Sequence, residues 1–345
     1  MKITAVETIK VFVPWRDSFK EPMRVWRAYN NRTTVEEEDA YVLIEMHTDE
    51  GIVGLGEGGR SVDEVRRQAE PLIGKDPLEL NPWGLDAPFV HAVYDILGKA
   101  HGVPAYRLFG EKHRDAIPVA YWSPYTGVKQ AAGFAEEGRS RGFHVHKIKA
   151  RPSDAVETIA AMCKAAGPDY AIRIDPNETF EQPAVTLRID DAVSGYNVEC
   201  WEDPVPKARL EWYELLRQRC KAAVCLHTSD PPLILEALRR NAADYFNIGQ
   251  NAETAIKSSA LCAAGGCPVW LQLEGHCLDI RGAFIAHLGA TIANATLPYD
   301  VLPFLREASI VTNPPEVKDG LMQVPEGPGL GIELDRQAVK RYHVG

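Results

Sequence analysis

The segment Lys147-Ile148-Lys149 places two basic side chains at the end of an apolar run. Because side chains alternate across a strand, both lysines face the same side. Two ammonium groups this close repel each other, so we expect a lowered pKa for at least one of them. A neutral amine of this kind can act as a base near neutral pH. Taken alone, the pair is equally typical of two surface lysines on an edge strand.

Two carboxylate motifs follow the next two apolar runs. They are Asp175-Pro176-Asn177 and Glu202-Asp203-Pro204. Carboxylate oxygens are the ligands that Mg²⁺ prefers in proteins. Either carboxylate alone could cap the helix that follows it. All three motifs in order, each at the end of an apolar run, favour a base beside a metal ion.

A repeating unit must bring these motifs together. From about residue 117, short apolar runs alternate with amphipathic stretches, such as a helix that we expect to begin at Ser153. This alternation predicts an α/β fold, a (β/α)8-type barrel in which the carboxyl ends of the strands share one mouth. The residues that close successive runs are polar and lie 20 to 27 positions apart: Lys149, Asp175, Glu202, His227, Asn247 and Gln272.

The rest of the chain predicts a second unit. We expect residues 1–116 to form an N-terminal α+β capping domain, 117–320 the modified barrel, and 321–345 a segment that returns to the capping domain. The first of these units contains strand-like segments, a turn and helical stretches at 2–13, 40–47, 48–51, 52–55, 62–74 and 87–100.

Composition excludes several classes of protein. The chain has 345 residues and a formal net charge of -10, which argues against nonspecific nucleic-acid binding. The charges at Lys2, Glu7 and Lys10 break the opening apolar segment, and no run is long enough for a membrane span. The 7 cysteines form no CxxC pair. We therefore expect reduced, mostly buried thiols and a cytoplasmic protein without nucleic-acid or membrane partners.

The three motifs together resemble the enolase superfamily, in its mandelate racemase and muconate lactonizing branch. The segments 1–14, 92–110 and 317–335 resemble the opening strand, the joining helix and the C-terminal segment of that branch. The resemblance implies a divalent metal, Mg²⁺ in the first place, that stabilises the enediolate left when a proton leaves the carbon beside a carboxylate. It also implies a small carboxylate substrate and a homo-oligomer.

Carried over position by position, the resemblance assigns roles to the motif residues. Lys149 would be the base on one face of the substrate, and Lys147 would tune it and touch the carboxylate. Asp175 and Glu202 would be metal ligands, and Asn177 would line the pocket.

The chain departs from the pattern of the branch at the third metal ligand. An acidic residue is usual there, and this chain has His227. Imidazole is a softer ligand than carboxylate and suits Mg²⁺ poorly. Three readings stay open: His227 binds Mg²⁺, Mn²⁺ or another ion, Asp230 replaces it, or two carboxylates and water hold the metal weakly.

A second departure concerns the proton donors on the other face. Asn247 stands where the branch has an Asp or a Lys, and Gln272 closes the next run. A racemase needs a donor on each face of the enediolate, whereas dehydration needs one strong base and an acid for the leaving group. Glu274 or His276 could be that acid, or either could be a loop residue. These losses favour a dehydratase.

The segment 15–35 is polar and rich in arginine and aromatic residues. The resemblance makes it a loop that covers the barrel mouth, where Arg24 could bind a carboxylate of an acid sugar. We therefore expect an acid-sugar dehydratase. A racemase, epimerase or cycloisomerase on the same scaffold, a carboxylate-binding paralogue without turnover, and a Schiff-base lysine barrel remain alternatives.

Overall fold

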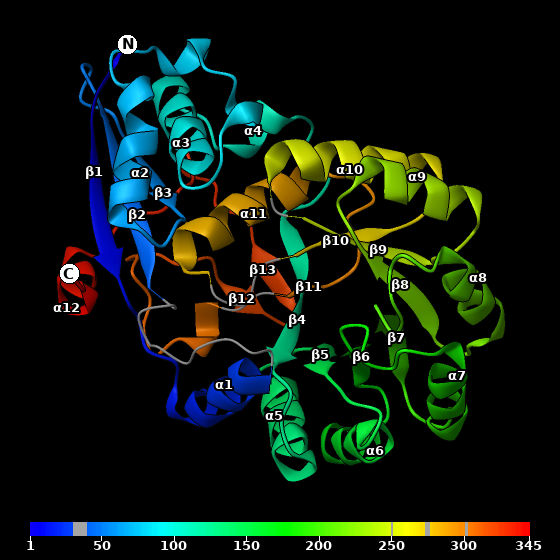
Figure 1. Ribbon diagram of the computed structural model, residues 1–345. Helices are drawn as coiled ribbons and strands as arrows, with labels where there is room; N and C mark the ends of the chain where they lie inside the picture. Colours follow the sequence, from blue (N-terminus) through cyan, green and yellow to red (C-terminus); the bar gives the residue numbers. More distant parts are fainter. Residues whose placement is uncertain (30–39, 250, 273–276, 301–302) are drawn as a thin grey trace.

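The computed structural model describes residues 1–29, 40–249, 251–272, 277–300 and 303–345. It contains an N-terminal sheet with its own helices and a larger barrel beside it (Figure 1). The expected α/β barrel with a capping α+β unit is therefore confirmed. No helix within the described ranges is long and apolar enough to cross a membrane.

The capping sheet is antiparallel, in the order β1 (Ile3–Val11), β2 (Tyr41–Thr48) and β3 (Val53–Glu57). The predicted turn between β2 and β3 is present, because Gly51 N donates to Thr48 O at 3.1 Å. Helices α2 (Val62–Ala69) and α3 (Phe89–His101) pack on the sheet (Figure 1). Glycine at position 54 allows α3 to approach closely, since a Cβ there would lie 2.2 Å from the Ala92 carbonyl oxygen.

Within the residues that the structure describes, eight parallel strands form the barrel. Sequential neighbours pair from the first to the seventh, and the eighth pairs with the first. Leu297 N donates to Val269 O at 3.3 Å, which joins the seventh strand to the segment before the eighth. The strands are β4 (Ala116–Ser123), β5 (Val145–Lys149), β6 (Ala171–Asp175), β7 (Val198–Glu202), β8 (Ala223–His227), β9 (Tyr245–Ile248), β10 (Val269–Leu271) and β11 (Tyr299–Asp300).

Amphipathic helices surround the strands, and a short hairpin extends the sheet beside β4 (Figure 1). The barrel helices are α5 (Val128–Ser140), α6 (Ala155–Ala166), α7 (Pro183–Ala192), α8 (Leu210–Arg219), α9 (Pro231–Arg239), α10 (Ala252–Ala264) and α11 (Asp279–Thr291). The remaining elements are α1 (Asp17–Tyr29), α4 (Tyr106–Phe109), α12 (Arg336–Tyr342), β12 (Val317–Lys318), β13 (Leu321–Gln323) and four 3₁₀ turns at Glu70–Leu72, Pro77–Glu79, Pro82–Gly84 and Pro303–Leu305.

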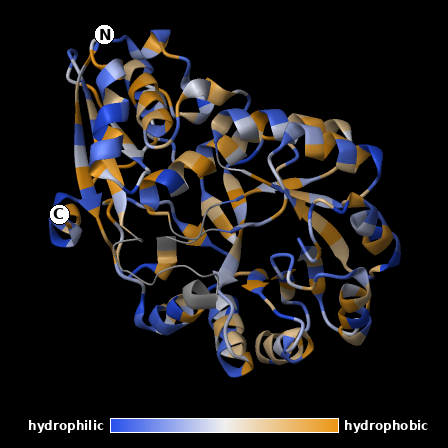
Figure 2. Cartoon of the chain, viewed as in Figure 1, coloured by the Kyte–Doolittle hydropathy of each residue, from blue (hydrophilic) through white to orange (hydrophobic). Residues whose placement is uncertain are grey.

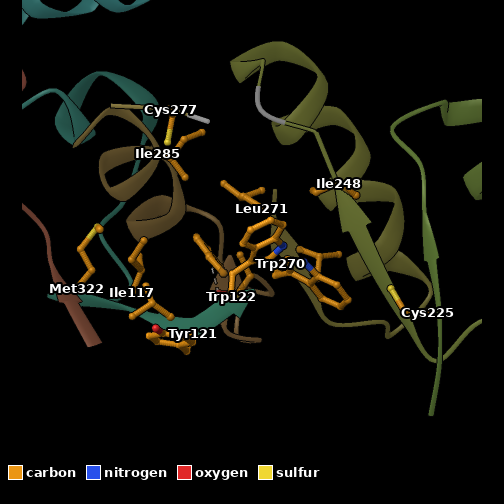
Figure 3. Close-up of a cluster of buried hydrophobic side chains, with 14 of the residues drawn as sticks. Ile117, Tyr121, Trp122, Cys225, Ile248, Trp270, Leu271, Cys277, Ile285 and Met322 are labelled. Carbon is orange, nitrogen blue, oxygen red and sulfur yellow. Dashed lines mark hydrogen bonds between the residues drawn. The ribbon is translucent and has the colours of Figure 1, made fainter. Parts of the chain in front are cut away.

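The barrel interior and the layer between strands and helices form one apolar core. Figure 2 shows hydrophobic colours on the barrel strands and mixed colours on the surrounding helices. Figure 3 shows Trp122 and Trp270 close together in this core, with Cys225 on β8, two strands away from Trp270 on β10. All 7 cysteines are free thiols, of which 5 are buried, as the sequence predicts.

Two local expectations are wrong. Helix α6 begins at Ala155 rather than at Ser153, because residues 151–154 form a turn in which Asp154 N donates to Arg151 O. The polar segment expected as a loop contains helix α1, whose Phe19 ring stacks on Phe134 of α5 at 4.5 Å. Burial of one aromatic side outweighs the polar average of that segment.

The C-terminal segment contacts the capping sheet. Arg336 at the start of α12 pairs with the buried carboxylate of Glu45 on β2. Phe12 N donates to Tyr342 O at 2.9 Å, next to a bridge between Val11 and His343. These contacts support the proposed division of the chain into a capping domain, a barrel and a returning segment.

Candidate active site at the barrel mouth

The strand ends bring most of the predicted residues to one place. Register pairs Lys149 of β5 with Asp175 of β6, and His227 of β8 with Asn247 of β9. Glu202 ends β7 between them. Parallel strands in a barrel all point their carboxyl ends to one mouth, so these side chains face a common centre.

Lys147 lies at the middle of this group and is buried. Its Nζ is 2.8 Å from Asp300, 2.7 Å from Glu202 and 3.4 Å from Asp175. Burial disfavours the charged ammonium, but the carboxylates of Asp300, Glu202 and Asp175 outweigh that effect and raise the pKa of Lys147 well above its usual range. The expected lowering of the pKa is therefore wrong for Lys147, because the attraction of three nearby carboxylates outweighs the repulsion from the second lysine.

Lys149 donates a hydrogen bond to Asp175 Oδ2 and is 8% exposed, so it reaches the mouth of the barrel. Burial opposes ionisation of Asp175, yet Lys149 and Lys147 together hold the pKa of this carboxyl well below its usual range. Asn177 N donates to the other oxygen of Asp175 at 2.9 Å. Asp175 therefore accepts a hydrogen bond from the turn after β6. It does not cap a helix, because α7 begins only after Gln182.

Asp300 is a member of the site that the sequence did not reveal. It ends β11, is buried, and contacts both Lys147 Nζ at 2.8 Å and Arg173 Nη1 at 3.5 Å. Its strand has only 2 residues, too few for an apolar period to mark it. A polar residue closing an eighth run at the barrel interval would have been the signal.

Three ligand-type side chains cluster beside Lys147. Glu202, Asp203 and His227 place one ligand atom each within 4.8 Å of one another. His227 Nδ1 lies 3.8 Å from Glu202 Oε1 and 3.9 Å from Asp203 Oδ2. Burial lowers the pKa of His227 to about 4, with Glu202 opposing, so the imidazole is neutral and has a free lone pair at neutral pH.

Asp203 holds the end of β8 in place. Its Oδ1 accepts from His227 N at 2.9 Å, and its Oδ2 pairs with Lys207 at 2.8 Å. Burial raises the pKa of Asp203 to about 7, and Lys207 opposes that rise. Asp203 adopts a φ of 46°, which turns its side chain back over the strand end.

Buried oxygen atoms in the same place test whether a metal ion fits. Asn247 donates from Nδ2 to Glu202 Oε1 at 2.8 Å, while Asn247 Oδ1 has no hydrogen-bond donor. Glu202 Oε2 lies near Lys147 Nζ but accepts no well-directed hydrogen bond. Buried oxygens are nearly always satisfied, so these atoms and the neutral imidazole fit a divalent cation.

The other predicted residues are less closely tied to this centre. Asp230 is exposed and caps α9 through Leu233 N, so it is engaged away from the cluster. Arg24 is exposed and pairs with Glu21 on its own helix at 2.6 Å. Gln272 follows β10, and its N–H donates to Ile248 O. Glu274 and His276 lie outside the described residues, so their roles stay predictions.

A capped β/α barrel with lysines and carboxylates at its carboxyl-terminal strand ends defines a class of metal-assisted enzymes. The family model "Enolase C-terminal domain-like" matches residues 130–338, more than half of the chain. The chain therefore belongs to the enolase superfamily, in its mandelate racemase and muconate lactonizing branch.

Characterised relatives and a solved structure extend this likeness over nearly the whole length. Chloromuconate cycloisomerase CbnB of Cupriavidus necator is 28% identical and covers 99% of each chain. D-galactarolactone cycloisomerase of Agrobacterium fabrum is 26% identical over 88% of this chain and 92% of its own. The crystal structure of 2-chloromuconate cycloisomerase from Rhodococcus opacus 1CP has a TM-score of 0.83 at 18% identity and covers 100% of both chains. The protein is thus an enolase-superfamily enzyme, a lyase or isomerase, whose chemistry begins at the α-proton of a carboxylate.

Proposed function

We propose that the protein is an acid-sugar dehydratase that uses Lys149 as its single strong base. Lys149 Nζ takes the α-proton, and the electron pair of the broken C–H bond moves into the substrate carboxylate as an enediolate. The pair then forms a C=C bond while the C–O bond to the β-hydroxyl breaks and a donor completes water. The enol product tautomerises to a 2-keto-3-deoxy acid.

The chain's own groups have separate tasks in this proposal. Lys147, which stays an ammonium, lies between Glu202 and Asp300 and offers its charge to the substrate carboxylate. Asn177 lines the pocket at the turn after β6. Glu274 or His276 would donate the proton to the leaving hydroxyl. A divalent cation held by Asp175, Glu202 and His227 would supply further positive charge beside the carboxylate when the α-proton leaves.

The observation that carries the proposal is the carboxamide at the end of β9. Asn247 is buried and bonded to Glu202 Oε1, and an amide neither takes nor gives the α-proton. Within 40–249 and 251–272, the strand ends of β9 and β10 both present carboxamides, Asn247 and Gln272. These carboxamides support a mechanism with a strong base on one face of the substrate only, which suits elimination and does not suit racemisation.

The test is a screen of acid sugars in deuterated water with the metal-supplemented enzyme. We expect a 2-keto-3-deoxy product that reacts with semicarbazide. Lys149→Ala should lower its rate about 10²- to 10⁴-fold, the usual contribution of a general base. Lys164→Ala, at an exposed position of α6, is the matched control and should change nothing. Deuterated substrate recovered together with its epimer would contradict the proposal, and unchanged activity in Lys149→Ala would favour a non-catalytic carboxylate-binding protein.

Cycloisomerisation is the second candidate, because both sequence relatives described above carry that name. It can begin with the same proton transfer to Lys149, with a ring oxygen of a lactone leaving in place of a hydroxyl. The Agrobacterium relative is named for a sugar-acid lactone. A polar substrate is therefore expected for this second candidate as well. Adding acid-sugar lactones to the screen separates the two, since ring opening consumes lactone without releasing water.

A further inference from the structure

We propose that a histidine nitrogen, from His227, binds the divalent cation of this site, and that the site therefore selects Mn²⁺ or a later transition ion over Mg²⁺. The inference rests on the proposed function, because it concerns the cation of the same site. The branch pattern has a carboxylate at this position, so the consequence is particular to this chain.

The first support is geometric. His227 Nδ1 is 3.8 Å from Glu202 Oε1 and 3.9 Å from Asp203 Oδ2. Two donors that each lie about 2.1 Å from one ion can be separated by at most about 4.2 Å. His227 and Glu202 therefore already lie at a spacing that two ligands of a single ion show, and the three ligand atoms all lie within 4.8 Å of one another. The hydrogen bond from His227 N to Asp203 Oδ1, at 2.9 Å, fixes the backbone at the end of β8. It therefore fixes the point from which the imidazole side chain extends.

The second support is independent of that spacing. Asn247 stands in register with His227 on the next strand, is fully buried, and has no donor for its Oδ1. Its amide nitrogen contacts Glu202, so the unpartnered oxygen belongs to the same group of side chains. A buried amide oxygen without a donor is uncommon, and a nearby cation would satisfy it.

The third support is that a carboxylate does not replace the histidine. Asp230 is the nearest acidic residue downstream, and it is exposed and bonded to Leu233 N as the cap of α9. Mg²⁺ strongly prefers oxygen ligands and gives up water reluctantly. Imidazole binds Zn²⁺ better than Mn²⁺, and it binds either of these ions better than Mg²⁺. A set of two carboxylates and one imidazole therefore favours the transition ions.

The experiment measures metal binding by the full chain without substrate. Stripped protein is titrated with Mg²⁺ and Mn²⁺ by calorimetry, and bound Mn²⁺ is examined by electron spin-echo modulation in protein with ¹⁵N-labelled histidine. We expect a histidine nitrogen coupling and Mn²⁺ binding about tenfold or more tighter than Mg²⁺. In His227→Asp the coupling should vanish and the Mn²⁺ to Mg²⁺ affinity ratio should fall about tenfold or more. His101→Asn, at an exposed position of α3, is the matched control and should behave as the parent chain.

The outcomes separate this inference from the proposed function. Bound Mn²⁺ without nitrogen coupling in the parent chain would overturn the inference, as would an unchanged affinity ratio in His227→Asp. The coupling is measured on the parent chain, so the inference stays testable even if His227→Asp does not fold, and His227→Asn offers a second variant. A nitrogen-coupled Mn²⁺ site in a protein that forms no keto acid would overturn the proposed function alone.

Discussion

Two lysines on one face of one strand differ in their surroundings. Lys147 is enclosed by three carboxylates from β6, β7 and β11, while Lys149 contacts Asp175 at the edge of the mouth. The first therefore keeps its proton as a fixed charge, and the second lies nearer to the mouth, where the proposed substrate would bind. This contrast between neighbouring side chains of the same type is what a base beside an electrostatic anchor requires.

Replacing Asp300 should show how much Lys147 depends on it. In Asp300→Asn the buried ammonium loses one of its counter-charges, so we expect the free energy of unfolding to fall by about 3 kcal/mol, as when a buried ion pair is broken. Catalysis should fall as well, since Lys147 loses its fixed position. Urea unfolding followed by fluorescence measures the change. Asp169→Asn, in an exposed pair with Arg139, is the control and should have no measurable effect. If Asp300→Asn were as stable as Asp169→Asn, the conclusion that Asp300 stabilises the buried ammonium of Lys147 would be wrong.

Sequence reasoning found the residues that end well-marked strands and missed what depends on distant partners. Lys149, Asp175 and Glu202 meet at the mouth as expected, because β5, β6 and β7 are long enough to show their periods. Asp300 was missed because β11 is short. The lowering of the pKa that was expected for at least one of the two lysines does not occur at Lys147, because the deciding carboxylates lie 28, 55 and 153 residues away and their number cannot be counted from spacing alone.

At the scale of elements, helix α11 joins the capping sheet to the barrel. Glu57 at the end of β3 accepts hydrogen bonds from Leu278 N and Arg281 N, the free donors of the first turn of α11. Glu57 N in turn donates to His91 Nδ1 on α3. A side chain of one unit thus caps a helix of the other.

Glu57 predicts a specific dependence of stability on pH. Burial raises its pKa from 4.5 to about 7, against the opposing bonds from Leu278 and Arg281. The folded state therefore holds this proton more tightly, so the contribution of Glu57 to stability is fully present below pH 4.5 and is lost as the pH rises to 7. The free energy of unfolding of the parent chain minus that of Glu57→Gln should fall by up to about 3 kcal/mol between pH 4.5 and 8.

Urea unfolding at several pH values checks this prediction. The difference between the two chains removes the contributions of the buried histidines, which both chains share. Glu136→Gln, at an exposed position of α5, serves as the control and should give a flat difference. A flat difference for Glu57→Gln would mean that Glu57 is ionised in the folded protein throughout this range.

Packing between α11 and β11 gives a second prediction for this element. A Cβ at Gly289 would lie 2.6 Å from the ring of Tyr299, the residue before Asp300. Gly289→Ala must push β11 away, so we expect a loss of about 1–3 kcal/mol in stability and reduced activity through Asp300. Gly133→Ala on α5 meets no atom within 4 Å and should be neutral or stabilising by up to about 1 kcal/mol. Thermal unfolding and rate measurements on both variants decide, and an active, stable Gly289→Ala would show that β11 can shift freely.

The elements themselves were largely predictable, but not all of their ends were. The six polar residues that close the predicted apolar runs lie within one residue of the ends of β5 to β10, whereas β4 and β11 were not marked in this way. The start of α6 was wrong because the turn after β5 uses backbone bonds rather than a serine cap. Helix α1 was missed because its composition is mostly polar. The contact that stabilises it, between Phe19 and Phe134 of the barrel helix α5, cannot be read from the segment alone.

At the scale of the whole molecule, part of the capping unit belongs to the apolar core of the barrel, while a second buried cluster, with Ile44 and Ala92, lies within the capping unit itself. Residues of β1 and β2, such as Val11 and Tyr41, belong to the same buried cluster as Ile148 and Trp270 of the barrel. Units that share a core and a helix cap should unfold together. The net charge of -10 is compatible with the proposed anionic substrate, because Lys147, Lys149 and the proposed cation would add positive charge locally at the mouth.

Removing the last ten residues tests this coupling. The deletion of 336–345 takes away α12 and leaves the buried Glu45 without Arg336 and Phe12 N without the Tyr342 carbonyl. Arg336 itself is largely exposed, so the pair is partly screened, and we expect the urea midpoint to fall by an amount that corresponds to about 1–3 kcal/mol, the cost of leaving a buried acceptor unpaired. If the core is shared, tryptophan fluorescence and far-ultraviolet circular dichroism should report one transition at the same lower midpoint. Restoring neutrality with Glu45→Gln in the shortened chain should recover part of the loss. Two separate transitions would show that the capping unit unfolds by itself, and the returning segment would then stabilise that unit alone.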